Sequence, residues 1–231
     1  MESSAVVVFS GGQDSTTCLA LARERHEEVF AISFAYGQRH AVELASAHAI
    51  CEKLDVPWRL IHLDFFAEMI TSALTGAGDV GSPHAHKPGL PASYVPNRNA
   101  LFLTLAHAHA QERGAKYLYT GACETDSSGY PDCRRDFIDA LELALNLGSE
   151  SAITICTPLM HLDKAQTFEL ANKLGILPLI ITDTHTCYNG GHTEQLLHPW
   201  GYGCGNCPAC QLRAKGYAGF LQHEDTGVAA W

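Results

Sequence analysis

The chain has 231 residues, of which 46% are hydrophobic and 17% charged, and its formal net charge is −10. These values are typical of a globular protein with one substantial α/β domain. The sequence contains no apolar run of about 18 residues, so no membrane span is predicted. The 15 Lys and Arg residues form no dense cluster, which weighs against a partner recognised through nucleic-acid phosphates.

Nine cysteines are present, and the first residues do not combine a basic region with a long apolar segment, as a secretory signal would. An odd number of cysteines in such a chain favours thiols and metal sites over disulfides. We therefore expect a cytoplasmic protein with no membrane partner.

A short apolar run at residues 5–8 predicts a buried strand, and the pattern from Leu19 onward predicts an amphipathic helix. Gly11 and Gly12 lie between them and let the backbone turn sharply and approach a ligand. The free N–H groups of the helix start then face that ligand with a partial positive charge. The turn is therefore predicted to cradle phosphate groups, through Phe9, Ser10, Gly11, Gly12, Gln13, Asp14, Ser15, Thr16 and Thr17.

The spacing of these residues excludes two common phosphate-binding motifs. The Walker motif needs a Lys after its last glycine, and the dinucleotide fingerprint needs further glycines where Gln13 and Thr16 stand. The stretch instead resembles the SGGxDS loop (PP-loop) of the N-type ATP pyrophosphatases, which hold the β- and γ-phosphates of ATP and release them as pyrophosphate. An ordinary glycine-rich turn is the alternative.

Further along the chain, apolar runs alternate with segments of helical periodicity. Strands are predicted at 29–34, 58–63, 116–120 and 152–156, and helices at 42–54, 100–113, around Phe137 to Leu145, and at 163–174. This alternation predicts a parallel sheet with right-handed crossovers and helices on both faces, with ligands at the carboxyl ends of the strands. Residues 75–96 lack periodicity and predict a long loop.

Beyond Ile181 this rhythm stops, and cysteines accumulate in the pattern C-x16-C-x2-C-x2-C. Four thiolates around one tetrahedral ion leave no open position, which is typical of a structural zinc site. The candidate ligands are Cys187, Cys204, Cys207 and Cys210. A ferredoxin-type cluster would need a further cysteine where Ala214 stands, and a cluster without metal is the other alternative. We expect an α/β domain at 1–181 and a Cys-rich zinc-binding segment at 182–231 packed on it.

Seven blocks, in order, resemble the 7-cyano-7-deazaguanine synthase family of queuosine precursor biosynthesis. They are FSGGQDSTT (9–17), YGQRH (36–40), VPNRN (95–99), TGACETDSSGYPDCRRDF (120–137), TPLMHLDKAQT (157–167), TCYNG (186–190) and the three closing cysteines. The chain departs from the family pattern at Ala35, where Asp is common, and at Asn97, where Gly is common. Asn97 in place of Gly affects which backbone conformations the loop at 95–99 adopts readily. The long spacing after Cys187 indicates an insertion at 191–202.

The resemblance implies a three-layer fold that is adenine nucleotide alpha hydrolase-like and Rossmann-like, with a small C-terminal zinc knuckle. It also implies a homodimeric ligase that uses ATP and Mg²⁺ to convert 7-carboxy-7-deazaguanine and ammonia to 7-cyano-7-deazaguanine. Adenylation turns a carboxylate oxygen into a good leaving group, and losing the remaining amide oxygen needs a second activation. Two AMP are therefore expected for each nitrile. No cysteine-based glutaminase signature is present, so free ammonium is the expected nitrogen donor.

The matching residues receive candidate roles. Asp14 could hold Mg²⁺ or orient the loop, and capping of the helix is the alternative. Lys164 could neutralise the phosphates or be a solvated lysine. Arg98, a third catalytic candidate, and Asn99 could contact either nucleotide or substrate. Acceptors for the donor-rich guanine edge are expected on the loop after the fourth strand; the candidates are Glu124, Asp126, Tyr130 and Asp132. A polar surface loop is the alternative for this group.

Two other functions fit the same fold. A tRNA-thiolating pyrophosphatase would use the same loop to adenylate a base carbonyl, but it would want a basic surface and a catalytic cysteine. A nucleotide sensor would bind ATP without turnover. Release of AMP, measured with and without a small-molecule substrate, separates the sensor from the enzymes.

Overall fold

The computed structural model describes residues 3–38, 42–69, 72, 82–84, 89–125, 129–190, 192–193 and 196–226. Asp126 and half of the long loop expected at 75–96, namely residues 75–81 and 85–88, lie outside these residues.

Five parallel strands form the central sheet, in the order β3-β2-β1-β4-β5. Their bounds are β1 Ser4–Val8, β2 Glu28–Ala35, β3 Trp58–His62, β4 Tyr117–Tyr119 and β5 Thr154–Cys156. All five had been predicted within a few residues, and the parallel α/β sheet is confirmed. The chain winds outward from β1 in both directions, so the carboxyl end of β1 lies at the switch point where open parallel sheets bind ligands.

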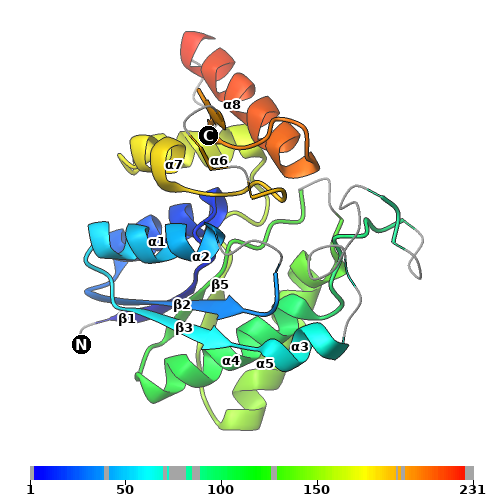
Figure 1. The fold of residues 1–231 in the computed structure, drawn as a ribbon. Helices are drawn as coiled ribbons and strands as arrows, with labels where there is room; N and C mark the ends of the chain where they lie inside the picture. Colours follow the sequence, from blue (N-terminus) through cyan, green and yellow to red (C-terminus); the bar gives the residue numbers. More distant parts are fainter. Residues whose placement is uncertain are drawn as a thin grey trace.

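Helices cover both faces of the sheet (Figure 1). On one face lie α1 (Gln13–Arg25) and α2 (Val42–Lys53), and on the other lie α4 (Arg98–Glu112) and α5 (Arg135–Ser149). The short helix α3 (Asp64–Met69) follows β3, and a single 3₁₀ turn, η1 (Pro131–Cys133), precedes α5. Neither of these short elements had been predicted.

Each face of the sheet has its own hydrophobic core, and β1 contributes to both. This is possible because successive residues of a strand point to opposite faces. Val6 is fully buried with Leu103 and Ile138, which come from the α4 and α5 side. Its neighbour Val7 is fully buried in a separate cluster with Leu19 of α1 and Ile50 of α2. The middle strand is therefore apolar from Ala5 to Val8, after its first residue, Ser4.

A third group of helices lies above α1 and α2 (Figure 1). It comprises α6 (Lys164–Lys173), α7 (Leu177–Asp183) and α8 (Pro208–Thr226), with a hairpin of β6 (Leu197–His198) and β7 (Gly201–Tyr202) inside the insertion. The expectation that regular structure stops after Ile181 was wrong, because α7 runs through that residue and α8 is 19 residues long.

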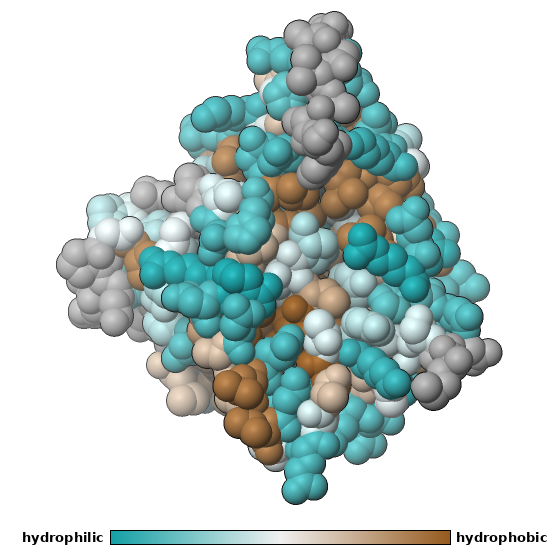
Figure 2. All heavy atoms as spheres, turned by 180° about the vertical axis from the view of Figure 1, so that it is seen from behind, coloured by the Kyte–Doolittle hydropathy of each residue, from teal (hydrophilic) through white to brown (hydrophobic). Residues whose placement is uncertain are grey.

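The outer surface is mainly hydrophilic on the side opposite to that of Figure 1, with limited apolar patches (Figure 2). Large apolar side chains that stay exposed include Leu143 and Leu147 of α5. None of the helices in the described ranges combines the length and apolar character needed to cross a membrane.

At Gly216, α8 packs tightly against α6. A Cβ at this position would overlap the Lys164 side chain and lie 2.9 Å from the Lys164 carbonyl carbon. One turn later, a Cβ at Gly219 would lie 3.1 Å from the Cβ of Ala165. Glycine therefore lets the C-terminal helix pack directly on the first residue of α6.

Gly216→Ala is expected to lower the free energy of unfolding by about 1–3 kcal/mol, because the two helices must separate or distort. Gly148→Ala is the matched control: it also lies in a helix, but its added methyl meets nothing within 4 Å. That change should raise stability by about 0.5–1 kcal/mol through helix propensity. Urea denaturation measures both, and equal stabilities of the two variants would contradict the close packing.

Candidate active site

The turn between β1 and α1 is held by hydrogen bonds within itself. The hydroxyls of Ser10 and Ser15 lie 3.1 Å apart, and Ser15 Oγ donates to the Gly12 carbonyl at 3.2 Å. No side chain among the described residues caps α1, whose N-cap is Gly12. The N–H groups of the first turn of α1 therefore point toward a ligand site at the carboxyl end of β1.

Two of the residues predicted to cradle phosphate direct their hydroxyls to the helix instead of the site. Thr16 and Thr17 are fully buried, and they donate to the carbonyls of Gly12 and Gln13 at 2.8 and 2.9 Å. These bonds fix the first turn of α1 and leave Ser10 and Ser15 as the hydroxyls that line the site.

Gly11 brings two distant segments against the turn. Its φ is +81°, and a Cβ there would lie 2.5 Å from the Glu43 carbonyl oxygen and 2.6 Å from the Ala47 nitrogen, both of α2. The Gly11 carbonyl also accepts a hydrogen bond from the backbone N–H of His185 at 3.0 Å. Only glycine fits this position, so the turn is wedged between α2 and the residues that lead to the cysteines.

Asp14 and Lys164 form an ion pair across the turn, with Nζ 2.7 Å from Oδ2. Lys164 is the first residue of α6, where Asp163 and Gln166 complete a capping box that fixes the helix start. The lysine side chain is only 10% exposed, so it is not a solvated lysine. Asp14 lies inside α1 and does not cap it, and its Oδ1 is buried without a partner among the described residues.

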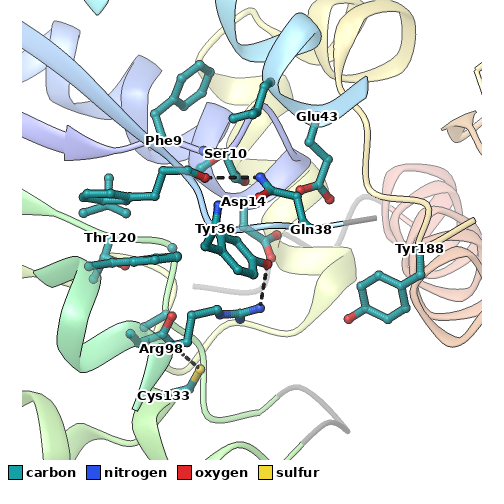
Figure 3. Close-up of a pocket in the computed structure, with 18 of the residues that line it drawn as sticks. Phe9, Ser10, Asp14, Tyr36, Gln38, Glu43, Arg98, Thr120, Cys133 and Tyr188 are labelled. Atoms are coloured by element: carbon teal, nitrogen blue, oxygen red, sulfur yellow. Dashed lines mark hydrogen bonds between the residues drawn. The ribbon is translucent and has the colours of Figure 1, made fainter. Parts of the chain in front are cut away.

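A first cavity, of about 300 Å³, opens beside this pair at the carboxyl ends of β1 and β2 (Figure 3). Phe34 and Phe102 form one wall, with their rings stacked at 4.5 Å between centroids. Ser10, Ser15 and Asp14 lie at the edge formed by the turn. The cavity thus combines a flat apolar wall with a polar edge that offers phosphate-binding groups.

Arg98 reaches into this cavity from the start of α4 (Figure 3). Asn97 precedes it in the left-handed conformation, with φ of +56°; Asn tolerates this region better than most residues, so it can stand where the family commonly has Gly. Arg98 Nη1 lies 3.4 Å from the Tyr36 hydroxyl. Burial opposes the charge of Arg98, but Tyr36 and other acidic neighbours raise its pKa overall, so it remains a cation.

Glu43 also lines the first cavity and is, with Asp14, one of its two carboxyl-bearing residues (Figure 3). Burial raises the pKa of this carboxyl to about 7, while the nearby Arg98 lowers it and Cys187 raises it. The side chain therefore changes charge close to neutral pH.

A second cavity, of about 520 Å³, lies on the other side of the ion pair. Lys164, Gln13 and Arg213 line its polar end, and Tyr130 and Pro91 contribute to the rest of its wall. Asp14 and Tyr188 line both cavities. A ligand in either cavity therefore reaches the same carboxylate of the turn.

The residues predicted to bind the substrate are divided by the structure. Arg98 and Asn99 line the first cavity, and Tyr130 lines the second. Glu124 and Asp132 line neither: Glu124 Oε2 accepts from the Arg135 backbone N–H at 3.1 Å, and Asp132 Oδ2 accepts from the Asn99 backbone N–H at 3.0 Å. These two carboxylates hold the starts of α5 and α4, and Asp126 lies outside the described residues.

Several cavity residues received no role from the sequence, although Tyr36 and Tyr188 stand in blocks that carry the family resemblance. Arg213 follows Cys210 by three residues, a spacing that places both on one face of a helix. That signal was usable only once residues 208–226 were known to be helical.

The four candidate metal ligands gather at the start of α8. The sulfur atoms of Cys187, Cys204, Cys207 and Cys210 all lie within 4.8 Å of one another. Sγ of Cys204 and Sγ of Cys210 are 4.0 Å apart, close to the separation of about 3.8 Å that Zn–S bonds of about 2.3 Å give in a tetrahedron. Cys187 also lines the first cavity. The cluster could hold a metal ion, and it adjoins the site.

The comparisons with known proteins agree on one family. A family model described as queuosine biosynthesis protein QueC matches residues 4–221. The 7-cyano-7-deazaguanine synthase of Wolinella succinogenes is 52% identical over 217 residues, which cover 93% of this chain and 92% of that protein. The protein of the same name from Herminiimonas arsenicoxydans is 48% identical over 231 residues, which cover 94% of this chain and 97% of the relative.

Among solved structures, one described as a predicted subunit of tRNA methyltransferase from Methanocaldococcus jannaschii has a TM-score of 0.50. The two chains are 21% identical, and the match covers 74% of each. This likeness concerns the fold alone.

Glu43→Gln is expected to change the pH dependence of stability. The folded chain binds the Glu43 proton more tightly than the unfolded chain, whose carboxyl has the ordinary pKa of 4.5. Glu43 therefore lowers the free energy of unfolding progressively as the pH rises from about 4.5 to about 7. Urea denaturation should show the variant gaining stability over the wild type through this window. A difference that does not vary with pH would contradict the burial of the carboxyl.

Proposed function

Because the chain belongs to the QueC family of queuosine biosynthesis proteins, we propose that it is an ATP-dependent ligase that forms 7-cyano-7-deazaguanine. Its substrates are 7-carboxy-7-deazaguanine, ammonia and ATP, and its other products are AMP and pyrophosphate. The observation that carries the proposal is the Asp14–Lys164 ion pair, which lies in the glycine-rich turn between two cavities.

Two adjoining cavities suit a reaction in which two molecules meet at one phosphorus atom. The stacked wall of Phe34 and Phe102 supports adenosine binding in the first cavity, with the triphosphate passing over the turn. The part of the larger second cavity around Tyr130 and Pro91 then takes the deazaguanine, and its polar end at Lys164 stays open to the phosphates. Tyr188 borders both and would separate the two ring systems.

The first adenylation breaks the bond between the α-phosphorus and the pyrophosphate. A carboxylate oxygen of the substrate attacks the α-phosphorus, and the electron pair leaves with pyrophosphate. Lys164 and the N–H groups of α1 neutralise the charge that develops on the leaving group, which is the main way in which proteins assist such transfers. Ammonia then attacks the acyl carbon, loses a proton and expels AMP, which leaves the amide.

The second adenylation activates the amide oxygen in the same way. Elimination of AMP with loss of two protons from nitrogen then gives the nitrile. Both adenylations use the same groups of the turn, so the amide has to stay bound while a second ATP replaces AMP. The first and second cavities allow this because the nucleotide and the deazaguanine occupy different spaces.

Two metals fit the residues present. The unpartnered Oδ1 of Asp14 is a carboxylate oxygen of the kind that Mg²⁺ prefers, and bound Mg²⁺ would neutralise triphosphate charge. The four gathered thiols, Cys187, Cys204, Cys207 and Cys210, suit one structural Zn²⁺ with no open position. The zinc would fix the start of α8 and the position of Cys187.

We propose that the chain forms a cytoplasmic homodimer that acts on small molecules and not on nucleic acid. The family resemblance supports the dimer, and the net charge of −10 supports small-molecule substrates. The ATP pyrophosphatase-like domain at 1–181 and the Cys-rich segment at 182–231 would work as one unit, because the latter supplies Thr186, Tyr188 and Arg213 to the cavities.

The wild-type protein, given Mg-ATP, ammonium and 7-carboxy-7-deazaguanine, is expected to release about two AMP for each nitrile, as read by mass spectrometry. Lys164→Ala should lower kcat by about 10²–10³, because it removes charge stabilisation at the leaving group. Lys53→Ala is the matched control, since Lys53 also pairs with a carboxylate, Asp183, but lines neither cavity. It should leave kcat within about twofold of wild type.

Other outcomes of this assay point to other functions. AMP without nitrile would overturn the substrate and favour adenylation of another carbonyl, such as that of a tRNA base. No AMP from folded, zinc-containing protein would overturn the enzyme and favour an ATP sensor.

Purified protein is expected to contain one zinc per chain by inductively coupled plasma mass spectrometry. Cys210→Ser should lose most of the metal and unfold at a lower temperature, because four thiolates close the site. Cys51→Ser, which alters a buried cysteine of α2 outside the cluster, should keep the zinc. Equal zinc contents in the two variants would contradict the assignment.

A further inference from the structure

The polar end of the second cavity collects buried atoms that lack partners. Within the described ranges, four buried side-chain nitrogen or oxygen atoms make no hydrogen bond: Gln13 Nε2, Asp14 Oδ1, Arg135 Nε and Arg213 Nε. All but Arg135 line the second cavity. Buried polar groups are almost always hydrogen-bonded in native proteins. Two donors and one acceptor left open in one cavity therefore indicate a polar ligand there.

Arg213 is held rigidly in this position. Its Nη1 donates to Thr186 Oγ1 at 3.1 Å, and its Nη2 donates to the Ile180 carbonyl at 2.7 Å and to Thr184 Oγ1 at 2.9 Å. A Cβ at Gly201 would overlap the guanidinium, so the hairpin leaves space for it only as glycine. The three bonds use the outer nitrogens and leave Nε for the cavity.

The charges at this end favour an anion. Lys164 already shares the carboxylate of Asp14, whereas no carboxylate lies within ion-pair distance of Arg213 in the part of the chain described. The guanidinium is only 1% exposed. Burial lowers its pKa to about 10, against the opposing effect of Asp14, so it is charged at neutral pH. A buried charge without a counterion is costly, and an anionic ligand removes that cost.

We propose that Arg213 is a second cationic residue of the pyrophosphate site, donating from Nε to the leaving pyrophosphate beside Lys164, with Gln13 Nε2 as a neutral donor. The inference rests on the proposed function, which supplies the pyrophosphate. It assigns a catalytic part to the C-terminal helix. Because Cys210 and Arg213 both lie on α8, which begins directly after Cys207, the helix that begins in the cysteine cluster also completes the phosphate site.

Binding of inorganic pyrophosphate to the full-length, zinc-containing protein tests the proposal, with calorimetry as the measurement. Arg213→Met should weaken this binding by about ten- to a hundredfold, the usual effect of removing a charge-assisted hydrogen bond. Arg213→Lys should recover part of it. Arg135→Met is the matched control, because Arg135 has the same open Nε but lines neither cavity; its affinity should stay within about twofold of wild type. A folded Arg213→Met variant that binds pyrophosphate as tightly as the wild type would overturn the proposal.

A second measurement uses the wild type and does not depend on whether Arg213→Met folds. The ¹H–¹⁵N resonance of Arg213 Nε, assigned by its loss in Arg213→Lys, should shift when pyrophosphate is added. An unchanged resonance at saturating pyrophosphate would overturn the contact. Failure of the proposed function looks different: the protein would make no AMP or nitrile, yet pyrophosphate would still bind in an Arg213-dependent way.

Discussion

The ion pair between Asp14 and Lys164 is the contact on which the arrangement of the site depends. It joins α1, at the carboxyl end of β1, to α6, which begins 150 residues later in the chain. The capping box of α6 fixes the lysine from one side, and the tight packing of α8 at Gly216 fixes it from the other. A position set by three helices keeps a cation next to the phosphate-binding turn before any ligand arrives, which is the preorganisation that charge stabilisation requires.

The C-terminal segment forms part of the site and is not a separate appendage. The His185 N–H bonds to the Gly11 carbonyl of the turn, Tyr188 borders both cavities, and Arg213 lines the second. Cys187 directly precedes Tyr188 in the chain, and Cys210 stands three residues before Arg213. A metal in the cluster would therefore hold two walls of the site together, without an open coordination position for the proposed chemistry.

The sequence was sufficient for the sheet and the turn, because both rest on local patterns. Buried strands such as β1 are short apolar runs that can be recognised in the sequence. The glycines of the turn can be recognised there too, and the close contact of Gly11 with α2 explains why that position needs glycine.

The long helix α8 was missed because Gly216 and Gly219 interrupt its apolar pattern, and both glycines serve a tertiary contact with α6. Glu124 and Asp132 were assigned to substrate as polar loop residues, and only the folded chain shows that they hold helix starts. The position of Arg213 in the site could not be predicted for the same reason, because its hydrogen-bond partners come from α7 and the segment after it.

The central claim is that a carboxylate and then an amide are adenylated at the turn beside Asp14 and Lys164. The transfer of ¹⁸O from the substrate to AMP is the test. The substrate, 7-carboxy-7-deazaguanine with ¹⁸O in both carboxylate oxygens, is converted with ammonium and Mg-ATP. The AMP is then analysed by mass spectrometry. Attack of each oxygen on an α-phosphorus predicts that every AMP carries one ¹⁸O and that pyrophosphate carries none. Label in pyrophosphate or inorganic phosphate, or nitrile formed with unlabelled AMP, would contradict the account.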